Sequence, residues 1–112
     1  MIARKNRFHG HGSLRFVYKN GKVVRSQLYL IKYCLNPKRS QYRLAVVVSK
    51  KVHKSAVVRN RIRRRIYEIV RNLKISTPLD IVFVIFDEQV ACMDAAELSD
   101  LVDRQFTGAH IK

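Results

Sequence analysis

Acidic residues are absent from the first 67 positions of this 112-residue chain. Those positions hold 19 lysines and arginines, whereas residues 68–112 hold 4 basic and 8 acidic residues, so the net charge of +15 divides into +19 and −4. Without a carboxylate, the positive part offers no general base or metal ligand of that kind, and it has no glycine-rich loop to cradle a phosphate. Charge so one-sided is typical of a surface that binds an extended polyanion.

Cysteines and long apolar runs are also scarce. Cys34 and Cys92 lie far apart in sequence without metal-ligand spacing, which is typical of reduced thiols in a cytosolic protein. No segment approaches the roughly 20 apolar residues of a membrane-spanning helix, and the N-terminal sequence MIARKNRFHGHG lacks the apolar run of a signal peptide. We therefore expect a cytoplasmic protein without a membrane partner.

The length and an apolar fraction of 47% predict a single folded domain over residues 1–112. Residues 1–12 show no apolar period and carry basic residues among glycines, so we expect a basic extended arm there. The HGHG sequence in this arm could suggest a metal-binding tract. Because no acid or cysteine lies nearby, we predict no metal site.

The segment from Ser49 to Leu73, SKKVHKSAVVRNRIRRRIYEIVRNL, combines a helical apolar pattern with the densest positive charge in the chain. Its apolar residues recur at intervals of four, four, three and four, which places them on one side of an α-helix: Val58, Ile62, Ile66, Ile69 and Leu73. The opposite side carries Arg61, Arg64, Glu68 and Arg71. Because the apolar side is needed for a core, this helix is not free to lie on a membrane surface.

The charges of this helix work against its stability. Arginines in the first turns face the positive end of the helix dipole, which costs roughly 0.3–1 kcal/mol where the charge is unscreened. Arg59 with Arg63, and Arg61 with Arg65, are like-charge pairs that each cost about 0.2–0.5 kcal/mol. Such a conflict indicates a functional site, and a phosphate backbone would supply the missing negative charge. A solvated basic face is the alternative, but solvated faces usually interleave acids.

The remaining patterns predict the element order α-β-β-α-β-α. Residues 13–21 read as a short helix closed by a glycine, and residues 24–35, 43–49 and 81–86 read as strands, the first of them interrupted near Arg25 and Ser26. Asp94 and Glu97 form a capping box that starts a closing helix. We expect an α+β fold, a two-layer domain with a small mixed sheet and a βαβ unit.

Two faces in this scheme concern function. In the short helix, Leu14, Val17 and Tyr18 share one side, and they either pack on the core, which the spacing favours, or stay open as a platform on which bases stack. In the first long strand, alternation puts Tyr29, Ile31 and Tyr33 on one face and Leu28, Leu30, Lys32 and Cys34 on the other.

The sequence RNRIRRRIYE, preceded by SKKVHKSAVV, resembles the arginine-asparagine-arginine signature of the protein subunit of bacterial ribonuclease P. The likeness continues in order along nearly the whole chain. NRF and SLRFVYKNGK resemble the amino-terminal pattern of that family, RLAVVVSKK its central strand, and LDIVFVIF its last strand. A basic triplet alone carries little information, whereas this ordered set is specific.

The resemblance implies an accessory protein subunit of an RNA-based endoribonuclease that removes the 5′ leader of precursor tRNA. The RNA subunit would carry the catalytic site and its Mg²⁺ ions, so the protein is expected to have no catalytic residue and to bind no cofactor or metal by itself. Its partners would be the catalytic RNA and the precursor tRNA leader, with no obligate protein partner. The resemblance also implies a left-handed βαβ crossover, an exception to the usual hand.

Site residues follow from the motifs that match the family. The signature residues expected to anchor the catalytic RNA are Arg59, Asn60, Arg61, Arg63 and Arg64. The residues expected in a leader-binding cleft between the short helix and the sheet are Leu14, Tyr18, Tyr33, Lys50 and Lys51. Further candidates for RNA contact are Arg7, Arg15, Lys54 and Arg65. We expect Glu68 to orient the arginines three and four residues away from it, which are Arg64, Arg65 and Arg71.

The chain departs from the family pattern at several positions. Leu14 stands where the family usually has a phenylalanine, and Tyr67 stands where it usually has an arginine. The family's cleft tyrosine on the first long strand maps to Lys32 or Tyr33, depending on a one-residue choice of register, and we assign it to Tyr33.

Two other functions are compatible with the residues. One is a structural RNA-binding protein, such as a ribosome-associated factor, with no role in cleavage. The other is a nuclease that acts alone through His53, which is disfavoured because no second titratable group lies at catalytic spacing in the sequence.

Overall fold

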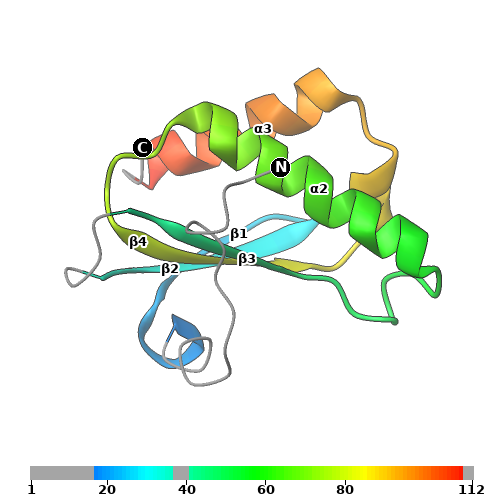
Figure 1. Ribbon diagram of the computed structural model, residues 1–112, viewed down its shortest axis with the longest axis horizontal. Coiled ribbons are helices and arrows are strands. Elements are labelled where there is room, and N and C mark those ends of the chain that lie inside the picture. Colours follow the sequence, from blue (N-terminus) through cyan, green and yellow to red (C-terminus); the bar gives the residue numbers. More distant parts are fainter. Residues whose placement is uncertain (1–16, 37–40, 110–112) are drawn as a thin grey trace.

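The computed structural model describes residues 17–36 and 41–109, which form two layers, a sheet and the helices packed on it (Figure 1). Residues 17–20 are helical. The elements that follow are β1 (Lys22–Arg25), β2 (Tyr29–Leu35), β3 (Arg43–Val47), α2 (Ala56–Leu73), β4 (Leu79–Ile85), the 3-10 helix η2 (Glu88–Ala91) and α3 (Ala95–Gly108). The predicted α+β class is confirmed, and the arm expected over residues 1–12 lies outside the described residues.

The sheet is mixed, with the strand order β1-β2-β4-β3. β2 pairs antiparallel with β1 and β4, and β3 pairs parallel with β4, so β3, α2 and β4 form the predicted βαβ unit. The predicted interruption is the turn between β1 and β2. The Ser26 hydroxyl accepts hydrogen bonds from the N–H groups of Leu28 and Tyr29 at 3.3 and 3.2 Å and closes this hairpin. The hand of the crossover stays a prediction.

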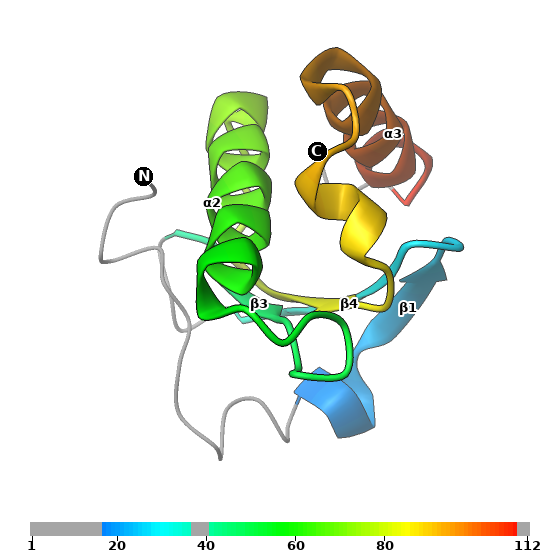
Figure 2. The same ribbon diagram turned by 90° about the vertical axis from the view of Figure 1, so that its right-hand side faces the viewer.

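The helices divide between the two faces of the sheet. α2 and α3 cover one face, and residues 17–20 lie on the other (Figure 2). The main core fills the space under α2 and α3, with buried residues from α2 (Ile62, Ile66 and Val70) and from α3 (Leu98, Val102 and Phe106). The rings of Tyr29, Phe83 and Phe106 form a row through this core, with centroids 5.3 and 6.0 Å apart.

α2 follows its predicted pattern with one shift at its C-terminal end. Val70 continues the buried row of Ile62 and Ile66 at four-residue steps, so the predicted Ile69 and Leu73 lie beside this row and are only partly buried. The helix starts at the N-cap Ser55, whose hydroxyl accepts a hydrogen bond from Val58 N–H at 3.5 Å. It ends because Lys74 adopts a left-handed conformation with φ 53°.

Candidate nucleic-acid interface

The exposed side of α2 carries two arginines without a partner in the described part of the chain. Arg61 and Arg64 are exposed, and neither makes a hydrogen bond or ion pair with another described residue. Val57 precedes them on the same side of the helix and is 73% exposed. This strip presents two free guanidinium groups to a ligand.

Three other arginines of α2 donate hydrogen bonds to backbone carbonyl oxygens of the protein. Arg59 donates to the carbonyl oxygens of His53 and Lys54 at 3.0 and 2.9 Å. Arg63 donates to Asn60 Oδ1 at 2.7 Å and to Val48 O at 3.4 Å. Arg65 donates to Val90 O at 2.9 Å and to Met93 O. The predicted arginines therefore form two groups. Arg59, Arg63 and Arg65 position α2, whereas Arg61 and Arg64 make no hydrogen bond with another described residue.

The expected role of Glu68 is met for only one arginine. The Arg71 guanidinium contacts Glu68 Oε1 three residues away. Arg65 instead donates to the backbone carbonyl oxygens of Val90, in η2, and of Met93, which follows η2. The prediction that Glu68 orients Arg65 is wrong.

The loop between β3 and α2 carries the basic residues Lys50, Lys51 and Lys54, all exposed. His53 holds this loop: its Nδ1 accepts a hydrogen bond from Ser55 N–H at 3.0 Å, and its Nε2 lies 3.8 Å from Glu88 Oε2. Sequence reasoning missed Glu88, because it reaches His53 only through the folding of η2 beside α2. One ring nitrogen is thus used for the turn that starts the helix, which favours a positioning role for His53 over a nuclease base.

The opposite face of the sheet has an aromatic and a cationic group in contact. Val17 is buried against Ala45 and Val82, whereas Tyr18 is 38% exposed. Lys32 Nζ donates to Tyr18 O at 3.2 Å and lies 5.0 Å from the centroid of the Tyr18 ring, within the range of a cation–π contact. The two alternatives for the short helix therefore each apply to one residue: Val17 belongs to the core, and Tyr18 remains accessible.

Gly21 sets the position of Tyr18 relative to the sheet. Its N–H donates to Val17 O at 2.8 Å and closes the helical turn of residues 17–20. A Cβ at position 21 would lie 2.5 Å from the same carbonyl oxygen, so only glycine allows this close approach.

Tyr33 lies on the other face, and its predicted place in the cleft is wrong. It packs against the main core beneath the helices, and its hydroxyl donates to Ala109 O at 3.5 Å. Since Tyr29 and Ile31 are fully buried on that same face, strand alternation leaves Lys32 on the side of Tyr18. The predicted site residues Arg7, Leu14 and Arg15 lie outside the described residues.

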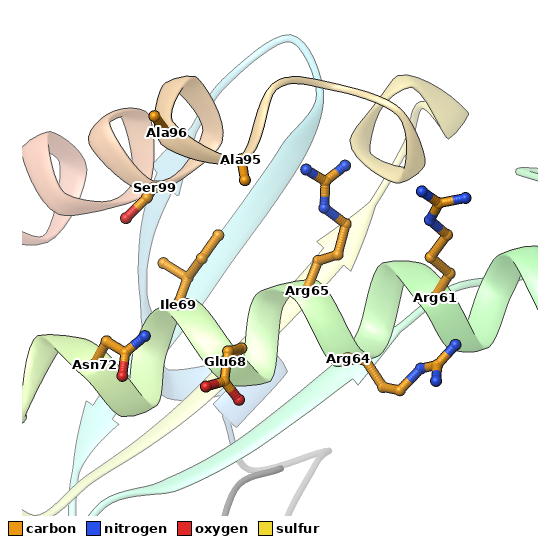
Figure 3. Close-up of a pocket in the computed structure, with 9 residues that line it drawn as sticks. All are labelled: Arg61, Arg64, Arg65, Glu68, Ile69, Asn72, Ala95, Ala96 and Ser99. Carbon is orange, nitrogen blue, oxygen red and sulfur yellow. The ribbon is translucent and has the colours of Figure 1, made fainter.

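A groove separates α2 from the start of α3 (Figure 3). It encloses about 660 Å³ and is lined from α2 by Arg61, Arg64, Arg65, Glu68, Ile69 and Asn72, and from α3 by Ala95, Ala96 and Ser99. In the part of the chain that the structure describes, no group of three or more His, Cys, Asp or Glu side chains could hold a metal ion. Within the same part, no helix is long and apolar enough to cross a membrane.

Comparisons with known proteins agree on one family. The family model described as Ribonuclease P matches residues 2–110. The "Ribonuclease P protein component" of Thermoanaerobacter sp. strain X514 is 43% identical over 70 residues, which are 61% of this chain and 59% of that protein. The protein of the same name from Clostridium kluyveri is 42% identical over 82 residues, which are 70% of this chain and 71% of that protein. The aligned part of the chain thus spans less than two thirds of the Thermoanaerobacter protein.

The fold has close counterparts among solved structures. A Staphylococcus aureus RNase P protein mutant with defective mRNA degradation activity superimposes with a TM-score of 0.83 and 25% identity, covering 96% of this chain and 90% of that one.

Proposed function

Because the chain belongs to the ribonuclease P protein family, we propose that it is the protein component of a ribonucleoprotein that removes the 5′ leader of precursor tRNA. In this proposal the catalytic RNA performs the cleavage with its own Mg²⁺ ions. The protein binds that RNA and the leader.

The observation that carries this proposal is the presence of two different RNA-compatible surfaces on opposite layers of one small domain. Arg61 and Arg64 of α2 are exposed and unpaired among the described residues, and guanidiniums of this kind bind phosphate oxygens. Tyr18 and Lys32 offer a ring and a cation, the combination with which proteins hold single-stranded nucleic acid. We assign the first surface to the catalytic RNA and the second to the leader.

The loop between β3 and α2 and the arginines that hydrogen-bond to the backbone have supporting roles in this proposal. Lys50 and Lys51 are exposed beside the end of β3 and can add phosphate contacts along either RNA. Arg59 and Arg63 anchor the segment between β3 and α2 to the first turns of α2, which keeps the open arginines at fixed positions. Asn60 is oriented by Arg63 and is exposed.

Cleavage of labelled precursor tRNA tests the proposal. The chain, the catalytic RNA and both together are incubated with the precursor at low magnesium. We expect mature 5′ ends to form efficiently only with both present. Cleavage by the protein alone would instead support a nuclease, and unchanged cleavage by the RNA would leave a structural RNA-binding protein.

Charge reversal links this activity to α2. Arg61→Glu should raise the protein concentration needed for half-maximal stimulation by roughly tenfold or more, because a repelled phosphate replaces an attracted one. Arg104→Glu is the matched control, since Arg104 is an exposed arginine of α3 outside the groove lining. Equal stimulation by the two variants would contradict the role of α2.

A further inference from the structure

The groove between α2 and α3 has an apolar floor and open polar groups at its rim. Ile69 is partly buried below the groove, and Ala95 and Ala96 line the facing wall. The amide of Asn72 and the hydroxyl of Ser99 make no hydrogen bond or ion pair with another described residue. Apolar surface with a few convergent polar groups is the usual composition of a small-ligand site, and about 660 Å³ lies in the usual size range.

One end of this groove is held rigid. Arg65 spans from α2 to the carbonyl oxygens of Val90 and Met93, so the two walls cannot move independently there. Figure 3 shows Arg61 and Arg65 pointing to the side of α3, whereas Arg64 points to the other side of α2 in this view. A ligand crossing α2 would therefore meet one free guanidinium inside the groove and one outside it.

The charge at the rim selects an anionic ligand. Glu68 is the one acidic residue in the groove lining, and its carboxylate is engaged by Arg71. Asp94 and Glu97, at the start of α3, do not belong to the lining. The side of α2 that approaches the groove thus carries the charges of Arg61 and Arg64, which no other described residue pairs.

We propose that this groove takes up one unpaired nucleotide of the catalytic RNA, with its base on Ile69 between the two helices. Its flanking phosphates lie on Arg61 and Arg64, and Asn72 and Ser99 hydrogen-bond the edge of the base. This inference rests on the proposed function. The nucleotide must be unpaired, because a base inside an RNA helix is stacked and paired and cannot enter a groove between two protein helices.

Filling the groove tests the proposal without changing any charge. Ser99→Phe places a ring between the walls, and Thr107→Phe makes a similar change at an exposed position of α3 outside the lining. We expect Ser99→Phe to weaken binding of the catalytic RNA by about tenfold, the range expected when one base loses its contact surface. Thr107→Phe should bind like the unmodified chain. Circular dichroism checks that both variants are folded.

Salt dependence separates the base contact from the phosphate contacts. Ser99→Phe should leave the slope of log affinity against log salt unchanged, because no phosphate contact is lost. Arg61→Ala should reduce that slope by about 0.7–0.9, the value expected for one released counterion. If Ser99→Phe fails to fold, Asn72→Ala at an exposed helical position replaces it, with an expected loss of about threefold.

Three outcomes would overturn the proposal or its premise. Equal affinities of Ser99→Phe and Thr107→Phe for the catalytic RNA would overturn the groove assignment alone. Loss of self-association in Ser99→Phe, measured by sedimentation with RNA affinity unchanged, would assign the groove to a second copy of the chain and overturn it as well. Failure of the unmodified chain to bind the catalytic RNA would overturn the proposed function itself.

Discussion

A buried carboxylate ties together three segments at one end of the sheet. Asp80 of β4 is 4% exposed and receives two hydrogen bonds from Arg43 of β3, each 2.8 Å long, and one from Asn36 Nδ2 at 3.0 Å. These hydrogen bonds raise the pKa of Arg43 above its ordinary value. Asp80, the only acid on the strands of the sheet, thus has a structural role. It does not neutralise the basic side chains that are proposed to bind RNA.

We expect Asp80→Asn to destabilise the fold by roughly 3 kcal/mol, because the variant breaks an ion pair whose two side chains are both largely buried. Asp100→Asn removes the same charge from the exposed pair with Arg104, where the expected loss is below about 1 kcal/mol. Urea denaturation at neutral pH measures both. Equal losses would mean that net charge, and not the buried contact, sets the effect.

Tyr29 gives the protein a pH-dependent stability at the alkaline end. Its side chain is fully buried, its hydroxyl donates to Gln105 Oε1, and burial raises its pKa well above the ordinary value of 10. The folded state therefore keeps the proton where the unfolded state loses it. This contribution to stability is complete below about pH 10 and is lost as pH rises from there toward the folded pKa.

Tyr29→Phe should be less stable than the unmodified chain by about 1 kcal/mol at neutral pH, because one hydrogen bond is missing. Above about pH 10 the difference in unfolding free energy between the two proteins should narrow. Only the unmodified chain loses stability through ionisation of Tyr29, by up to about 1.4 kcal/mol per pH unit. Urea denaturation near neutrality and at about pH 11 compares the two. A gap that stays constant across this range would contradict the assignment.

At the scale of elements, α2 is both the central support of the core and the carrier of the open charges. Its apolar residues recur with helical spacing, so the helix could be predicted from sequence. The sequence could not predict which arginines make no contact with the protein. The carbonyl groups that bind Arg65 follow it by 25 and 28 residues and approach it only in the folded chain. Tyr33 shows a related limit: the pattern gave two faces of β2 correctly, but only the burial of Tyr29 and Ile31 tells which face meets the helices.

The sheet order illustrates why topology is harder to predict than elements. The continuous apolar sequences of β3 and β4 predicted buried strands, and both are largely buried. Their parallel pairing, with β4 inserted between β2 and β3, depends on how α2 packs over the sheet. That information lies in contacts between distant segments and not in any local period.

The C-terminal end of α2 holds a conformational cost that can be relieved. Lys74 has φ 53°, a left-handed conformation that is unfavourable for a residue with a Cβ. Lys74→Gly should stabilise the fold by about 0.5–1 kcal/mol, because glycine adopts this conformation without the steric penalty. Lys74→Ala is the control, since it removes the charge but keeps the Cβ. A gain in thermal stability with alanine as large as with glycine would contradict the steric explanation.

At the scale of the molecule, the sequence asymmetry of charge becomes a spatial one. β1, β2, β3 and most of α2 come from the basic part of the chain, and Glu68 is the one acid that these elements carry, whereas η2 and α3 carry Glu88, Glu97, Asp100 and Asp103. α2, which carries the open arginines, and residues 17–20, which include Tyr18, lie on opposite faces of the sheet (Figure 2). Such an arrangement allows one small protein to contact two RNA segments at the same time.

If the two surfaces bind different RNAs, substitutions on each surface should weaken binding of only one RNA, and their effects on binding free energy should be additive. Lys32→Ala should weaken binding of precursor tRNA to the holoenzyme by roughly fivefold, with no effect on mature tRNA, because only the precursor has a leader. Arg61→Ala should weaken binding of the catalytic RNA by a similar factor and leave the leader preference intact. Since the two side chains share no partner, the double variant should show the sum of the two free-energy changes. Affinities of precursor and mature tRNA, measured at saturating protein, provide the test. Equal weakening of precursor and mature tRNA binding by Lys32→Ala would show that the leader does not bind this face of the sheet. It would also contradict the assignment of the two surfaces to different RNAs.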